Sequence, residues 1–243
     1  MKTFNRWIRI LVLPAILIAA AGAYFGFGLG EFLSFETLAR NREWLLEQVA
    51  NNRLATLAAF LAVYAGVVTL SVPGATILTV TSGFLFGPFL GTIYAVIGAT
   101  IGATLLFLLA RSAFRELFRS WAGKYLARLE DGFKQNALSY LLFLRLVPLV
   151  PFWLVNLVPA LLDVSLRIFV IGTFFGIIPG TLVYASVGNG LGAILAQGGR
   201  PDLGIIFSPE ILLPILGLAA LALVPAGYRH FRGTPEIQEK KNG

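Results

Sequence analysis

An arginine surrounded by apolar residues is the side chain of this sequence that most strongly indicates chemistry. Arg145 lies in the segment LLFLRLVPLVP, which contains no other charged residue. Placing an arginine at membrane depth costs at least about 2.5–3.5 kcal/mol, and a partner must offset that cost. No acidic residue occurs over residues 54–110 or 137–162. An anionic ligand such as phosphate, which fits the guanidinium fork, is therefore a candidate partner. The alternatives are snorkelling to the membrane interface or bonds to the carbonyl groups of a broken helix.

Other chemically active side chains are few. Asn156, in the same apolar stretch, is a weaker candidate because an amide can pair with loose backbone groups. The chain has no cysteine and a single histidine, His230, which argues against a zinc enzyme, a cysteine nucleophile and a Ser-His-Asp triad. The run GNGLG at 188–192 has no βαβ pattern around it and is not a dinucleotide fingerprint. We expect that the protein is not an enzyme and that it binds neither a cofactor nor a metal.

The composition indicates that these residues are held in a membrane. Of 243 residues, 57% are hydrophobic and only 13% are charged, and the mean hydropathy is +0.81. A soluble domain carries about 25% charged residues. The net charge of +7 comes from basic residues that flank apolar segments. This placement favours membrane orientation and contact with anionic lipid headgroups over binding of nucleic acid.

The N-terminal region, residues 1–53, combines an apolar run with a charged segment. We expect residues 8–30 to form an uncleaved membrane span with a cytoplasmic N-terminus, and a cleaved signal peptide is the alternative. Residues 31–53 have balanced charges and helical spacing of apolar residues, with Ser34 as an N-cap. They predict a short amphipathic helix on the outer face.

The region over residues 54–195 contains apolar segments interrupted by glycine and proline. Breaks at Pro73-Gly74 and Gly87-Pro88 leave a middle piece too short for a span of about 20 residues. Residues 137–162 are likewise expected to break at three prolines, Pro148, Pro151 and Pro159. Between these stretches, residues 111–136 are basic and predict either an interfacial helix on anionic lipid or a solvated cytoplasmic connector. Its candidate lipid contacts are Arg111, Arg115, Arg119 and Lys124.

The basic segments decide how often the chain crosses the membrane. The N-terminus, residues 111–136 and the C-terminal tail are basic and should be cytoplasmic. Residues 54–88 and 137–162 then dip in from opposite faces and return, while residues 89–110 and 164–187 span. With a last span at 211–228, in the C-terminal region 196–243, we expect an all-α protein with four spans and two re-entrant hairpins forming an inverted repeat. A shift of 78 residues aligns Pro73 with Pro151, Gly98 with Gly176 and Gly102 with Gly180.

Two of these segments resemble a known family. SVPGATILTVTSGFLFGPFLGTIYAVIGATIGA at 71–103 and RLVPLVPFWLVNLVPALLDVSLRIFVIGTFFGIIPGTLVYASVG at 145–188 are similar to the DedA superfamily, in its SNARE-associated Golgi protein or VTT-domain branch. The resemblance implies facing re-entrant hairpins and transbilayer movement of phospholipid or polyprenyl phosphate. Many bacterial members carry acids in the first hairpin that are linked with proton coupling, and this chain has none there. The candidate binding residues of the two hairpins are Pro73, Gly74, Thr76, Thr79, Gly83, Gly87, Arg145, Pro148, Pro151 and Asn156.

Three functions are compatible with these features. The first is a scramblase- or flippase-like lipid transporter in which Arg145 holds the lipid phosphate. The second is a transporter of a small anion or metal species, and the third is a membrane scaffold or assembly factor. We expect a bacterial inner membrane location with both termini cytoplasmic and membrane lipids as partners. Self-association is left open.

Overall fold

The chain is helical wherever its structure is described. The computed structural model describes residues 34–121, 136–147, 150–162, 164–191 and 202–232, together with Gly22, Gly26 and Gly28. No strand occurs in these residues. The predicted first span at 8–30 lies outside them, apart from the three glycines. The elements are α3 (Phe35–Arg40), α4 (Arg42–Asn51), α5 (Arg53–Thr69), α6 (Ala75–Phe86), α7 (Pro88–Trp121), the helix Asn136–Leu146, α9 (Phe152–Leu161), α10 (Leu166–Asn189), the 3-10 turn η1 (Leu203–Phe207) and α12 (Pro209–Arg232).

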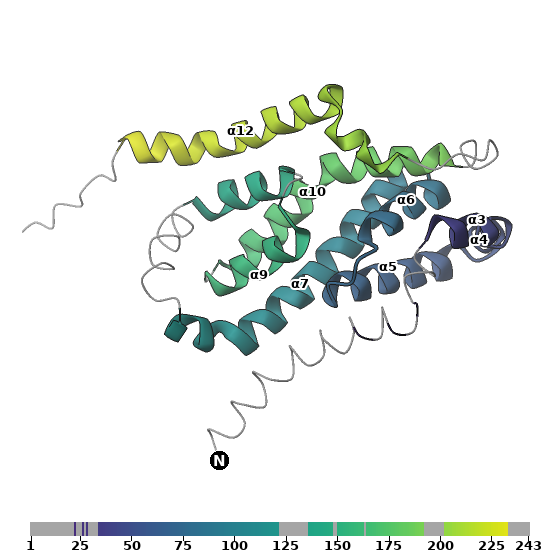
Figure 1. Cartoon of the computed structure of the whole chain (residues 1–243), viewed down its shortest axis with the longest axis horizontal. Helices are drawn as coiled ribbons and strands as arrows, with labels where there is room; N and C mark the ends of the chain where they lie inside the picture. The colour runs from purple at the N-terminus through teal and green to yellow at the C-terminus, as the bar shows by residue number, and fades with distance from the viewer. Residues whose placement is uncertain are drawn as a thin grey trace, which may run out of the picture.

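The central helices form two similar halves (Figure 1). In each half a helix, a turn and a short helix precede a long helix: α5, α6 and α7 in the first, and the helix Asn136–Leu146, α9 and α10 in the second. The short helix of each half packs against the long helix of the other, α6 on α10 and α9 on α7, and the two long helices contact each other. Reciprocal packing of this kind is what two related repeats produce.

Glycine and proline end the helices of the first half where the sequence predicts. Gly74, with φ of 131°, follows the turn after α5, and Gly87, with φ of 79°, separates α6 from α7. Such positive φ values favour glycine because it lacks a Cβ atom. In the second half Pro151 precedes α9, as expected, but Pro159 lies inside α9 and the predicted break there is wrong. Membrane helices tolerate an internal proline when neighbouring groups satisfy the freed carbonyl.

Two of the predicted spans are confirmed as helices long and apolar enough to cross a membrane. They are Pro88–Ser112, with 25 residues, and Leu166–Asn189, with 24. Their outward faces carry large apolar side chains such as Phe89 and Phe175, which are 75% and 59% exposed. Exposed apolar surface of this extent is typical of a protein that contacts lipid or another protein, and lipid accommodates such side chains. The apolar helices Arg53–Thr69, Ala75–Phe86, Asn136–Leu146 and Pro209–Pro225 are shorter.

Two predicted segments differ from the observed helices in how they are divided. The span ending at residue 110 and the basic segment beginning at 111 form one continuous helix, because α7 runs from Pro88 to Trp121. No glycine or proline lies between residues 103 and 121 to interrupt it. The expected single amphipathic helix at 31–53 is divided into α3 and α4 at Asn41. Ser34 does cap α3 as predicted, since its Oγ accepts from the Thr37 N–H at 3.2 Å.

Small residues hold the helices close together around α7. One face of α7 carries alanines that are almost completely buried: Ala95, Ala99, Ala103 and Ala110. Glycines likewise allow close approach of the two helices where α6 crosses α10. A Cβ atom on Gly83 would overlap the Ala185 carbonyl, and one on Gly188 would overlap the Val80 carbonyl. Close backbone approach through small residues is typical of helix packing in membranes.

Candidate functional site

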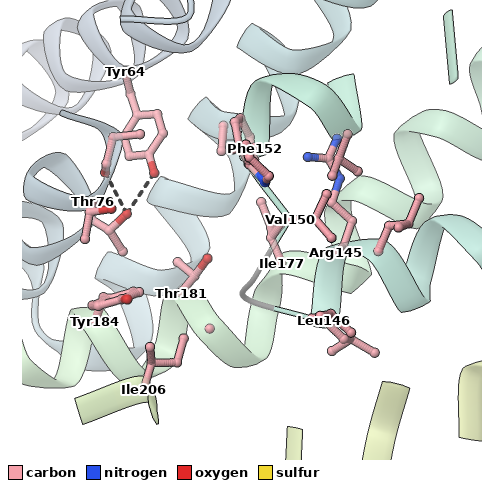
Figure 2. Close-up of a pocket in the computed structure, with 18 residues that line it drawn as sticks. Tyr64, Thr76, Arg145, Leu146, Val150, Phe152, Ile177, Thr181, Tyr184 and Ile206 are labelled. Carbon is pink, nitrogen blue, oxygen red and sulfur yellow. Dashed lines mark hydrogen bonds between the residues drawn. The ribbon is translucent and has the colours of Figure 1, made fainter. Parts of the chain in front are cut away.

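A cavity of about 380 Å³ lies between the two halves (Figure 2). This volume is within the range of about 300–1,000 Å³ that is typical of small-molecule sites. Every central helix contributes to its wall, as do η1 and the residues that join the helix Asn136–Leu146 to α9. The lining residues are Tyr64, Ala75, Thr76, Thr79, Ala99, Leu144, Arg145, Leu146, Val147, Val150, Pro151, Phe152, Val155, Ile177, Gly180, Thr181, Tyr184 and Ile206.

Arg145 lies in the wall of this cavity and is held by two neutral side chains. Its Nη2 donates to Asn156 Oδ1 at 2.6 Å and to Thr173 Oγ1 at 2.9 Å. Asn156 lies on α9 and Thr173 on α10, and both are completely buried. The hydrogen bonds of Arg145 among the described residues therefore go to side chains and not to backbone carbonyls. The Asn156 side chain accepts a hydrogen bond from Arg145, and no bond from it to an unpaired backbone group is seen among the described residues.

Two aromatic rings lie against the Arg145 guanidinium. Its Cζ lies 4.8 Å from the centre of the Phe152 ring and 5.5 Å from the centre of the Phe169 ring. Phe169 is fully buried and stacks on Phe107, with 4.3 Å between ring centres. Phe152 instead lines the cavity together with Arg145. Cation–π contact compensates part of the lost hydration of the charge.

The hydrogen-bonding capacity of this cluster is not filled. Arg145 Nε and Nη1 and Asn156 Nδ2 are buried, and none has a partner in the part of the chain that the structure describes. All three are donors, since a guanidinium has no acceptor and an amide nitrogen only donates. No acidic side chain is among the described residues that line the cavity. The cluster thus presents a positive charge and three free donors, and an anionic acceptor is the group that would satisfy them.

Glycine on α10 makes room for this arginine. A Cβ atom on Gly176 would lie 2.7 Å from the Cβ of Arg145, which is too close. In the first half the corresponding glycine on α7, Gly98, faces Tyr64 in the same way, with 3.0 Å to its Cβ. The alignment of Gly98 with Gly176 is therefore matched by their surroundings. Tyr64 and Arg145 occupy equivalent places in the two halves.

The first half contributes hydroxyl groups to the cavity. The Tyr64 hydroxyl lies 2.8 Å from Thr79 Oγ1, which in turn donates to the Ala75 carbonyl at 2.9 Å. A threonine hydroxyl has one proton, so Tyr64 is the donor to Thr79 and its oxygen stays available as an acceptor. Thr76, Thr181 and Tyr184 complete this hydroxyl-bearing part of the wall.

The candidate residues named from the sequence fall into three groups. Thr76, Thr79, Arg145 and Pro151 line the cavity, and Asn156 lies directly behind Arg145. The others from the first hairpin serve the backbone instead: Pro73 and Gly74 in the turn before α6, Gly83 in packing against α10, and Gly87 in the turn before α7. Pro148 lies outside the described residues.

The candidate lipid contacts at the end of α7 are described only in part. Arg111 Nη1 donates to the Val164 carbonyl at 3.3 Å, and its Cζ lies 5.9 Å from the centre of the Phe107 ring. Arg111 thus joins α7 to the start of α10. The side chains of Arg115 and Arg119, and all of Lys124, lie outside the described part of the chain.

Several residues of the site were not predicted from the sequence. Thr173, Phe152 and Phe169 surround the arginine, and Tyr64 and Thr181 line the cavity, yet each belongs to a common residue type in an apolar run. For Tyr64 the sequence contained only an indirect signal. The 78-residue shift aligns Gly98 with Gly176, and the structure shows that Tyr64 contacts Gly98.

Comparison with known proteins agrees with this architecture. Residues 72–190 match the VTT domain. The chain is 32% identical over 183 residues to a Transmembrane protein 41 homolog of Caenorhabditis elegans, covering 72% of this chain and 70% of that protein. It is 32% identical over 185 residues to a Transmembrane protein 41 homolog of Dictyostelium discoideum, and 29% identical over 175 residues to human Transmembrane protein 41B. These matches cover 74% and 70% of this chain but only 53% and 57% of the two relatives. No solved structure matches.

Proposed function

Because the chain belongs to the VTT-domain family of membrane proteins, we propose that it moves phospholipid or polyprenyl-phosphate lipid across the bilayer. The polar headgroup passes through the cavity between the two halves, and the acyl or prenyl tails stay in the surrounding lipid. Arg145 binds the phosphate. A path of this kind removes the main barrier to lipid movement, which is the cost of taking a charged headgroup through hydrocarbon.

The unsatisfied donors around Arg145 are the single observation that supports this proposal most strongly. Keeping a charged guanidinium away from water is costly unless its donors are used. Here two guanidinium nitrogens and the Asn156 amide remain without acceptors among the described residues. A phosphate offers several acceptor oxygens and one or two negative charges. It therefore has enough acceptors for these donor atoms, and its charge is opposite to that of the guanidinium.

The membrane arrangement that we propose is an inverted repeat. The pairs α5 with α6, and Asn136–Leu146 with α9, enter from opposite faces and return, while α7, α10, α12 and residues 8–30 span. Four observations support it: the short lengths of the paired helices, the glycines that bound α6 in the first pair, the reciprocal packing of the two halves and the basic flanks. Both termini are then cytoplasmic, in a bacterial inner membrane. The function needs no enzyme activity, cofactor or nucleic acid.

The path is passive in our proposal. Neither an acidic residue nor a histidine lines the described cavity, so its wall offers no group that exchanges a proton near neutral pH. A scramblase-like protein needs only a route and lets the lipid gradient set the direction.

Reconstitution tests the proposal directly. Purified protein is placed in liposomes that contain a phospholipid with a fluorescent acyl chain, and a membrane-impermeant quencher reports how fast inner-leaflet lipid reaches the outer leaflet. We expect faster movement than in empty liposomes, and loss of this movement in Arg145→Ala. Arg167→Ala is the matched control, because Arg167 is exposed at the start of α10 and does not line the cavity.

Other outcomes identify other functions. Uptake of a soluble anion without lipid movement indicates a solute transporter. If lipid movement equals that in empty liposomes while charge reversal at Arg115 and Arg119 disrupts the protein's role in cells, a scaffold function is indicated. Equal activity of Arg145→Ala and the unmodified protein contradicts the assignment of the phosphate site.

A further inference from the structure

The cavity has two chemically different ends. Figure 2 shows Tyr64, Thr76, Thr181 and Tyr184 on one side and Arg145 on the other, with apolar residues such as Phe152 and Ile177 between them. The hydroxyl residues come from α5, α6 and α10. A headgroup whose phosphate lies at Arg145 would place its remaining atoms among these hydroxyls.

Two of these hydroxyls have no hydrogen-bond partner among the described residues. Five of the eleven threonines on the described helices donate to the carbonyl four residues earlier, namely Thr69, Thr79, Thr81, Thr92 and Thr104. Thr76 and Thr181 make no hydrogen bond among the described residues, and both line the cavity half-buried. Tyr184 makes only a long bond of 3.4 Å to the Leu203 carbonyl. These groups can donate to and accept from a ligand.

Charge balance decides which ligand suits this end. Arg145 is the one charged residue that lines the described cavity, so a phosphate at that end neutralises it. An ammonium group at the hydroxyl end would meet no acidic side chain among the described lining residues, so its charge would be uncompensated there, which is costly. A polyol carries no charge and pairs with hydroxyls as donor and acceptor. A polyprenyl monophosphate has no distal group and would leave these hydroxyls unused.

We propose that Tyr64, Thr76, Thr181 and Tyr184 form a second subsite that binds the hydroxyl groups of a polyol headgroup, so that the preferred substrate is a phosphodiester lipid with a glycerol-like headgroup. This subsite rests on the proposed lipid movement and determines which lipid moves fastest. Sites that hydrogen-bond a substrate hydroxyl discriminate strongly against analogues that lack it, because their own polar groups then stay unpaired.

The test compares two lipids that share acyl chains and label. Phosphatidylglycerol carries hydroxyls beyond its phosphate, and phosphatidylcholine carries a quaternary ammonium without an N–H donor. We expect the unmodified protein to move phosphatidylglycerol faster. The double variant Thr76→Val with Thr181→Val keeps both side-chain shapes and should reduce the ratio of the two rates by about tenfold, since each lost hydrogen bond contributes a modest amount.

The control variant is Thr81→Val on the same helix. The Thr81 hydroxyl donates to the Ile77 carbonyl and lies outside the cavity, so the ratio should not change. An unchanged ratio in the double variant, or equal rates for the two lipids in the unmodified protein, overturns the polyol subsite while leaving lipid movement intact. Failure of the unmodified protein to move either lipid overturns the proposed function itself. Uptake of soluble glycerol phosphate without lipid movement would assign both subsites to a free solute.

Discussion

We predict that the Phe152 ring limits the access of a phosphate to Arg145, so that removal of the ring accelerates the proposed lipid movement. The Phe152 ring lies 4.8 Å from the guanidinium carbon and lines the cavity. Arg145 lines the same cavity, and its Nε and Nη1 are buried without a partner among the described residues. If the ring shields these donors from the cavity, a phosphate reaches them only after the ring has moved aside. Phe152→Leu keeps an apolar side chain at the position but removes the aromatic face.

The size of the effect follows from the contact that must be broken. A cation–π contact away from water is worth about 1–2 kcal/mol. If moving the ring limits the rate, removing this contact lowers the barrier by about the same amount. Each 1.36 kcal/mol is a factor of ten in rate, so lipid movement should accelerate by about 5–30-fold.

The liposome quenching assay measures this rate, and the second aromatic ring provides the control. Phe169 lies 5.5 Å from the same guanidinium but is fully buried, stacks on Phe107 and does not line the cavity. Phe169→Leu removes a comparable contact without opening a path. We expect it to lower thermal stability and to leave the rate unchanged or reduced.

The opposite result would refute the prediction that the Phe152 ring limits access to Arg145. If Phe152→Leu is as stable as the unmodified protein yet moves lipid at the same rate or more slowly, the ring does not limit access. If Phe169→Leu accelerates movement equally, the effect comes from weaker packing around Arg145 and not from access through the cavity.

Three further perturbations follow from the same contacts. Asn156→Asp places a carboxylate where Oδ1 now lies 2.6 Å from Arg145, so the internal ion pair should raise the melting temperature and slow lipid movement at least tenfold. Gly83→Ala and Gly188→Ala insert a methyl group into the backbone contact between α6 and α10 and should destabilise the protein by about 1–3 kcal/mol in thermal or denaturant unfolding. Gly66→Ala meets open space on α5 and should be neutral or stabilising. Collapse of a transmembrane pH gradient with an ionophore should leave the rate of lipid movement unchanged, since no described cavity residue is an acid or a histidine; a rate that follows the gradient would contradict the passive path.

Backbone breaks and charge placement could be predicted from the sequence because they depend on local properties. Positive φ at Gly74 and Gly87 occurs where Pro-Gly and Gly-Pro pairs interrupt apolar runs. The placement of Arg145 among apolar segments, partly buried in the wall of the cavity, followed from its apolar neighbours. Pro159 was misassigned, because whether an internal proline ends a helix depends on tertiary contacts that the sequence does not display. The continuation of α7 past residue 111 was missed because charge was read as a structural boundary.

The partners of Arg145 could not be predicted because they come from distant segments. Thr173 lies 28 residues away in the chain, and only the packing of α10 against the helix Asn136–Leu146 brings the two together. Gly83 was named as a candidate binding residue with close helix packing as the alternative, and in the structure it lies against the Ala185 carbonyl of α10. A glycine needed for close approach and one needed at a ligand have the same sequence signature, and the partner surface alone distinguishes them.

In the proposed lipid movement, the difference between the two halves would let one cavity both bind and release an anionic headgroup. Tyr64 and Arg145 face equivalent glycines, Gly98 and Gly176, yet one is neutral and the other charged. Arginine at both positions would place two like charges in a cavity of about 380 Å³ and would hold a phosphate from both sides. Conduction requires sites that attract a ligand without retaining it. A single guanidinium opposite a wall of hydroxyls meets this requirement, because the headgroup exchanges a charged contact for neutral hydrogen bonds as it moves from one half to the other.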